Sequence, residues 1–208
     1  MLNAEQWEER RNQVGASDVY YLLNFDNKTP KKLWREKTGG SEPSLFENKY
    51  TVFGNIVEEP CLKFFFNSHK APYELDKRVA HKDIERFVSS TDGMLNEATE
   101  GIPVENKTIK VEKYTKDMMN KQYYTQLQAQ ISCSGSSHGY LIYNTAKEED
   151  YEHPLLYEPS KETQFVHKYD RDDELITNID NRVRYFLVCI DDKIEPTEKG
   201  YKEFMNEK

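Results

Sequence analysis

The pattern of apolar and polar residues predicts helices and strands along most of the chain. Apolar residues three or four positions apart predict long helices over 49–67, over 118–134 and from near Asp172 onward. Segments of strand character lie at 73–80, 84–91, 138–144 and 163–169. Helices that flank strands throughout a chain are typical of an α/β or α+β fold with a central mixed sheet.

Shorter helices are expected before residue 49. They are a polar helix at 3–13 around Trp7, a helix with Ser17 as N-cap, and a helix that begins at Pro30 and stops at Thr38-Gly39-Gly40. Arg10 and Arg11 close the first of them, near the negative end of its dipole. The plain interpretation of this arginine pair is solubility. The alternative is a phosphate clamp, since guanidinium groups match phosphate oxygens.

The length and composition place the chain among folded proteins. Its 208 residues fit one domain with a full core, and 12% aromatic residues supply enough apolar surface to fold. We expect an N-terminal helical part at 1–48, a catalytic core at 49–144, and a loop, a strand and a packing helix at 145–208.

Charge and cysteine usage exclude several classes of protein. A net charge of -8 argues against a uniformly basic polyanion binder, but local basic groups can still lie beside an acidic metal site. Three scattered cysteines without a C-x-x-C disfavour a zinc ribbon or an iron–sulfur cluster and suit a reducing cytoplasm. No apolar run approaches the roughly 20 residues of a membrane span, so no membrane partner is expected.

The best candidate for chemistry is the segment 88–107, which predicts a strand, a short excursion and a second strand. Glu105 and Lys107 share one face of the second strand, while Val104 points toward a core. If the two strands pair as a hairpin, Asp92 approaches Glu105. Two carboxylates and an ammonium on one face suit a hard cation and a phosphate. The plainer interpretation is a turn at Asp92 and a solvated Glu-x-Lys pair.

Two predicted helices add further polar candidates. Glu58 and Glu59 are adjacent in the helix 49–67, so one acid can face inward while the other is solvated, although a surface pair is the plainer interpretation. Gln126 follows Tyr123 by three residues in the helix 118–134. A glutamine beside a core-facing stripe needs a partner, which we expect to be a metal-bound water, a nucleotide or a backbone group.

Six short segments follow the order and spacing of one known family. They are Trp7 with Arg10 and Arg11 before Gly15-Ala16-Ser17-Asp18; Thr29-Pro30 with Leu33-Trp34 and Lys37-Thr38-Gly39; Gly54 with an acid four residues on; Ser90-Thr91-Asp92-Gly93; Glu105-Asn106-Lys107; and Tyr123 with Gln126-Leu127-Gln128. Together they resemble the lambda-exonuclease or YqaJ-type viral recombinase nucleases of the PD-(D/E)XK superfamily. The resemblance covers nearly the whole chain.

The resemblance implies a restriction-endonuclease-like core with a metal site. Asp92, Glu105, Glu58 and the backbone carbonyl near Asn106 would hold one or two Mg²⁺ ions, which Mn²⁺ can replace. Lys107 would orient the attacking water and offset phosphate charge. Glu58 matches the helical acid because it lies four residues after Gly54. Its rival is Glu59, which precedes proline as the family acid often does.

The resemblance also assigns the remaining polar candidates. Gln126 matches a glutamine near the metals, and Tyr123 a neighbouring tyrosine. Arg10 or Arg11, with Ser17, matches a site for the 5′ phosphate end. The implied activity is a 5′-to-3′ exonuclease on linear duplex DNA ends in phage-type recombination. A single-strand annealing protein is the implied partner and a ring-shaped homotrimer the implied assembly.

Two departures from the family pattern keep other hypotheses open. Thr91 stands where the family usually has proline, and Asn106 where it usually has an apolar residue. They favour a DNA-binding or regulatory module with weak or lost catalysis. A third hypothesis is a structure-specific endonuclease. A sugar or nucleotide hydrolase with paired acids has no role for Lys107.

Overall fold

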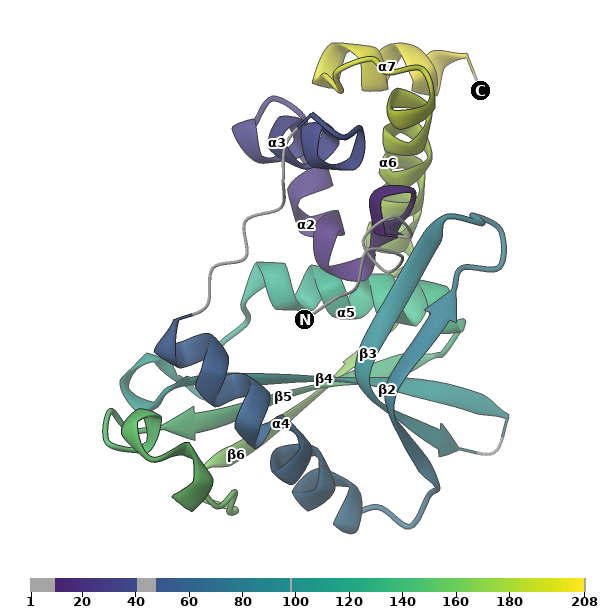
Figure 1. The fold of residues 1–208 in the computed structure, drawn as a ribbon. Coiled ribbons are helices and arrows are strands. Elements are labelled where there is room, and N and C mark those ends of the chain that lie inside the picture. The colour runs from purple at the N-terminus through teal and green to yellow at the C-terminus, as the bar shows by residue number, and fades with distance from the viewer. Residues whose placement is uncertain (1–9, 41–47, 98, 208) are drawn as a thin grey trace.

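The computed structural model describes residues 10–40, 48–97 and 99–207, and Trp7 lies outside them (Figure 1). The helices are α2 (Val19–Leu22), α3 (Lys28–Lys37), α4 (Lys49–Asn67), α5 (Lys121–Ser134), α6 (Asp173–Asp191) and α7 (Glu198–Asn206), with short 3-10 helices that include η1 (Ala16–Asp18). The strands are β1 (Val14–Gly15), β2 (Tyr73–Ala80), β3 (Phe87–Glu97), β4 (Glu100–Lys110), β5 (His138–Ala146) and β6 (Gln164–Asp170).

Polar caps define the two helices that flank the sheet. The side chains of Asn48 and Asn120 each accept hydrogen bonds from two backbone N–H groups in the first turn of α4 and of α5. Gly135, with a φ of 73°, ends α5 in the left-handed conformation that glycine adopts without strain. α4 runs through Pro60 as one helix.

Strand β3 changes partner along one of its edges. Residues 93–97 pair antiparallel with 100–104 of β4, whereas the start of β3 pairs in parallel with β1. Strand β2 pairs antiparallel along the other edge, while β4 pairs in parallel with β5 and β5 antiparallel with β6. The sheet is therefore mixed, as predicted. Because β3 and β4 part just beyond their last pair, Asp92 and Glu105 lie where the sheet forks.

The helices α4 and α5 cover opposite faces of the sheet (Figure 1). Leu127 of α5 packs in one cluster with Leu141 of β5, and Leu62 of α4 packs in another with Ile142. Consecutive residues of a strand point to opposite faces, so the two clusters lie on the two sides of β5. The charged groups at the fork therefore lie between two well-packed layers.

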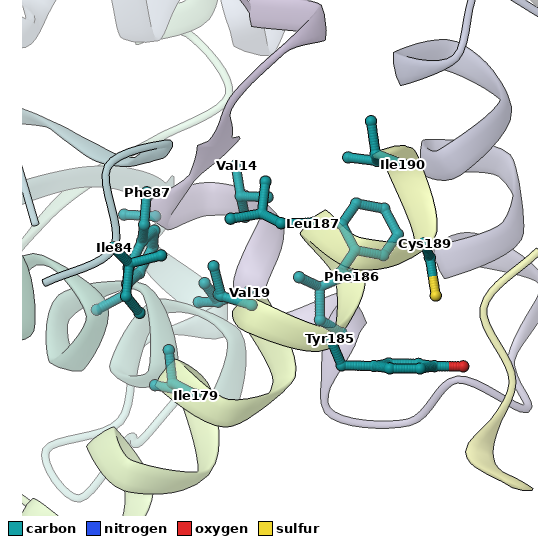
Figure 2. Packing of buried hydrophobic residues seen from close by; sticks show 14 of the residues in the cluster. Val14, Val19, Ile84, Phe87, Ile179, Tyr185, Phe186, Leu187, Cys189 and Ile190 are labelled. Carbon is teal, nitrogen blue, oxygen red and sulfur yellow. The ribbon is translucent and has the colours of Figure 1, made fainter. Parts of the chain in front are cut away.

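A second core joins the N-terminal segment to the C-terminal helices. Val14 and Val19 pack against Phe87 at the start of β3 and against Phe186 of α6 (Figure 2). Burial of such apolar side chains stabilises the fold by about 1.5–3 kcal/mol for each residue. This core holds residues 14–25 beside β3 and α5.

Three local predictions differ from the structure. Ser17 lies inside η1 and does not cap α2, whose preceding residue Asp18 instead accepts a hydrogen bond from the Gly15 N–H at 3.0 Å. Pro30 lies two residues inside α3 rather than at its first position. The helix α7 was not expected, because its nine residues carry few apolar side chains and depend on contacts with Tyr185 and Phe25.

Candidate active site

The carboxylate of Glu105 is the centre of the polar cluster at the fork. Its side chain is fully buried. Oε1 accepts a hydrogen bond from Nε2 of Gln126 at 2.7 Å and pairs with the Lys107 ammonium, and Oε2 accepts from Nε2 of Gln130. A buried charge is stable only when it is paired and hydrogen-bonded, and these three donors supply that pairing.

Lys107 remains a cation in this environment. Burial by itself lowers the pKa of an ammonium, but the negative charges of Glu105 and Asp92 outweigh it and raise the Lys107 pKa. The ammonium also lies 5.5 Å from the ring centroid of Tyr123, which adds a cation–π contact. A lysine with a raised pKa is a poor general base and a good electrostatic partner for phosphate.

Asp92 lies directly across the fork and is held by the strand opposite. Its Oδ2 accepts a hydrogen bond from the Asn106 N–H at 2.7 Å. Burial, followed by the charge of Glu105, raises the pKa of Asp92 well above its usual range. The ionised form of Asp92 is therefore disfavoured beside Glu105, although the positive charge of Lys107 opposes the shift.

Glu58 and Glu59 of α4 have different surroundings. Glu58 is half-buried, and burial raises its pKa, with Lys107 opposing the rise. Glu59 is exposed and pairs with Lys63 on the outside of the helix, at 2.5 Å. The helix thus directs Glu58 toward the charges at the fork and Glu59 away from them. The role of Glu58 as a metal ligand stays a prediction.

The close approach of α4 to the fork depends on Gly93. A Cβ atom built on Gly93 would lie 2.6 Å from a ring carbon of Phe66. The Asp92-Gly93 pair lies inside β3 and does not form a turn. The absence of a side chain on Gly93 leaves room for Phe66 of α4 to pack against the strand. This closeness lets an α4 side chain reach groups on β3 and β4.

The donor set fits a divalent cation by its chemistry. Asp92, Glu105 and Glu58 offer hard carboxylate oxygens, and three acids face a single ammonium. Within residues 10–40, 48–97 and 99–207, however, no three acid, histidine or cysteine side chains converge closely enough to hold an ion. The Glu105 oxygens instead contact Lys107 and two glutamines. A bound ion would therefore exchange with at least one of these contacts.

The candidate phosphate residues lie on the segment that leads into β1 and η1. Arg10 and Ser17 are exposed, and Arg11 is half-buried. The segment packs against α5 and β3, the two elements that carry Gln126 and Asp92. It thus flanks the fork, as a site for the phosphate end requires. The role of these residues in phosphate binding stays a prediction.

Lys37 of α3 holds this segment in place. Its ammonium donates to the backbone carbonyls of Arg10, at 3.0 Å, and of Gln13, at 2.5 Å, and it lies 3.2 Å from Oδ2 of Asp18. The side chain is only 10% exposed, so these bonds are shielded from water. In the sequence this lysine stands out only as part of a motif, because its structural role depends on a contact between distant segments.

Thr91 and Asn106, the two residues that depart from the family pattern, both have hydrogen-bond partners. The hydroxyl of Thr91, buried in β3, donates to the Lys77 carbonyl at 3.2 Å. The side-chain oxygen of buried Asn106 accepts from Nδ2 of Asn144 at 2.6 Å. Neither residue is an unsatisfied polar group behind the site. The two positions therefore bring no unpaired polar group to the site, and the hypothesis of weak or lost catalysis stays a prediction.

Gln130 is the site residue that sequence reasoning missed. It is fully buried and lies one turn after Gln126 on α5. Its Nε2 donates a hydrogen bond to Oε2 of Glu105. The spacing of four residues was the available signal, because side chains at i and i+4 lie on one face of a helix. Periodicity alone does not show that Gln130 shares the Glu105 carboxylate with Gln126.

Comparison with known proteins gives one family and several solved folds. The model of the YqaJ-like viral recombinase domain matches residues 6–137, which is more than half of the chain. The uncharacterized protein YqaJ of Bacillus subtilis (strain 168) is 28% identical over 97 residues. That match covers 45% of this chain and only 30% of the relative.

Solved structures share the fold over nearly the full chain. The alkaline exonuclease LHK-Exo from Laribacter hongkongensis, solved in complex with dAMP, has a TM-score of 0.71 at 20% identity and covers 92% of this chain and 95% of its own. A phage related exonuclease from Haemophilus somnus 129PT has a TM-score of 0.63 at 16% identity, with 94% and 96% covered. At these identities the likeness establishes the fold alone.

Proposed function

Because this chain belongs to the YqaJ-like viral recombinase domain family, we propose that it is a metal-dependent nuclease that cleaves DNA from linear duplex ends, in the 5′-to-3′ direction. The observation that carries the proposal is the cluster at the sheet fork, where buried Glu105 lies with half-buried Asp92 and Lys107 and Glu58 is turned toward them. The named relatives with the same fold are exonucleases.

Each residue at the fork has a separate role in the proposed reaction. Mg²⁺, held by Asp92, Glu105, Glu58 and the carbonyl of Asn106, would supply Lewis acidity and an activated water. Lys107, kept charged by its carboxylate neighbours, orients the water and offsets the charge of the scissile phosphate. Gln126 fixes the orientation of the Glu105 carboxylate.

The N-terminal segment is proposed to select the DNA end. Arg10 or Arg11, with Ser17, binds the 5′ phosphate, because guanidinium groups hold phosphate oxygens in a bidentate manner. Tyr123 supports this side of the site through its contact with Lys107. A ring-shaped homotrimer and a single-strand annealing partner complete the proposal, which places the chain in phage-type recombination.

Digestion of 5′-labelled linear duplex DNA tests this function. We expect degradation with Mg²⁺ or Mn²⁺ and none with EDTA, and a loss of at least about 100-fold, or 2.7 kcal/mol of barrier, in Asp92→Ala and Lys107→Ala. Lys82→Ala, an exposed lysine on the β2–β3 connection, is the control. Cleavage of closed circular DNA would point to an endonuclease. DNA binding without cleavage in either metal would point to an inactive module.

A further inference from the structure

A row of buried amide side chains crosses the sheet beneath α4. Nδ2 of Asn144 on β5 donates to Oδ1 of Asn106 on β4 at 2.6 Å. Nε2 of Gln164 on β6 donates to Oδ1 of Asn144 and to the backbone carbonyl of Cys61 in α4, both at 2.9 Å. We call Asn106, Asn144 and Gln164 the amide ladder. All three side chains are at most 9% exposed.

The amide ladder interrupts an otherwise apolar interface. On one side of it Leu62 and Phe65 of α4 pack with Ile142, and on the other side Phe53 and Val57 pack with tyrosines of the loop after β5. Apolar contacts fix the depth of a helix on a sheet but tolerate sliding, whereas hydrogen bonds are directional. A fully paired polar layer in this place therefore fixes the position of α4 along the sheet.

Both ends of the ladder adjoin the candidate site. At one end, Cys61 lies three residues after Glu58, on the same side of α4. At the other end, Asn106 lies between Glu105 and Lys107, and its N–H holds Asp92. The ladder thus connects the α4 backbone, one turn beyond Glu58, to the strand that carries the other charged groups.

We propose that the amide ladder is a positioning network, which holds α4, and with it Glu58, in place against the strand that carries Glu105 and Lys107. The inference rests on the proposed function and extends it to residues outside the charged cluster. It also explains Asn106, which is a partner for Asn144 and Gln164 and not a defect in the apolar layer. Hydrogen-bonded supports of metal ligands typically change metal affinity or activity by 10–100-fold when they are removed.

Calorimetric titration of the DNA-free full chain with Mn²⁺ tests the ladder. Gln164→Met keeps the side-chain length but removes the bond to α4, and we expect about 10-fold weaker Mn²⁺ binding. Asn144→Ala should weaken binding by the same factor, and the double variant by no more, because both cut one chain of bonds. In cleavage assays kcat should fall while KM for DNA stays within twofold.

A matched variant separates positioning from stability. Ile142→Val removes a methyl group from the same interface and so costs some stability, but it leaves the ladder intact. It should keep Mn²⁺ affinity within twofold. Equal Mn²⁺ affinity in the wild type, Gln164→Met and Asn144→Ala, or an equal loss in Ile142→Val, overturns the inference alone. A wild-type chain that neither binds Mn²⁺ nor cleaves DNA overturns the proposed function as well.

Discussion

At the scale of single residues, burial decides which polar groups do chemistry. Glu58 and Glu59 are identical in type and adjacent in sequence, yet one is half-buried near Lys107 and the other pairs with Lys63 in solvent. The sequence narrowed the choice to these two acids. Only the rotation of α4 on the sheet, which packing determines, separates them.

These two acids form a matched pair of variants. We expect Glu58→Gln to reduce metal-dependent DNA cleavage by at least about 100-fold, because it removes a charge directed at the fork. Glu59→Gln should stay within twofold, since its carboxylate pairs with Lys63 in solvent and points away from the fork. Single-turnover rates of the two variants check this. The reverse ranking would make Glu59 the relevant acid and contradict the orientation of α4.

At the scale of elements, long-range contacts fix segments that have weak patterns of their own. α7 is fastened to α6 by two bonds between the Arg182 guanidinium and the Glu198 carboxylate, at 2.7 and 2.8 Å. The same carboxylate accepts the backbone N–H of Phe25 at 3.1 Å. Three distant parts of the chain therefore meet at Glu198, and no local pattern predicts that meeting.

The Glu198 contacts predict a pH dependence of stability. Hydrogen bonds from Arg182 lower the pKa of Glu198 below its usual value of about 4.5. A lowered pKa gives stability that is complete above the unfolded pKa and is lost as the pH falls through the folded pKa. Glu198→Gln should therefore lower Tm at pH 7 by roughly 2–4 °C for each kcal/mol lost.

Thermal unfolding between pH 7 and pH 3 checks the sign. The Tm difference between the wild type and Glu198→Gln should shrink as the pH falls below about 4.5. Glu203→Gln, an exposed acid on the same helix, is the control and should change Tm by less than about 2 °C. A difference that stays constant down to pH 3 would rule out the ionic contribution of Glu198.

At the scale of the whole molecule, the charge balance is acidic while the proposed substrate is a polyanion. The net charge is -8, and three of the acids that contribute to it, Asp92, Glu105 and Glu58, lie close together at the fork. A bound divalent cation would offset this crowding of acids. In the described part of the chain, no helix has both the length and the apolar character to cross a membrane.

A ligand that binds only the folded state raises its stability. At 100 times its Kd, Mn²⁺ should stabilise the wild type by about 2.7 kcal/mol, which is a rise in Tm of several degrees. Asp92→Asn should lose this rise. The exposed acid variant Asp83→Asn should keep it. Scans at equal ionic strength measure the effect, and an equal rise in all three chains would mean general screening of charge.

Periodicity and motif order determined much of the molecule from the sequence alone. The apolar repeats of 49–67, 118–134 and the helix after Asp172 correspond to α4, α5 and α6, because burial of one helix face imposes a 3.6-residue period. The spacing of Glu105 and Lys107 likewise placed both on one strand face, where they pair. The family followed from the order of its motifs, and the family model matches residues 6–137.

Only the tertiary structure decided which polar side chains of these helices and strands contact one another. The fork that brings Asp92 to the Asn106 N–H, the grip of Gln130 on Glu105, and the bonds of Gln164 across the sheet join residues 14 to 103 positions apart. A sequence pattern reports which face of an element is buried, because burial acts on each residue locally. It does not report which buried polar groups meet, because their pairing depends on strand register and helix rotation, and packing of the whole chain sets both.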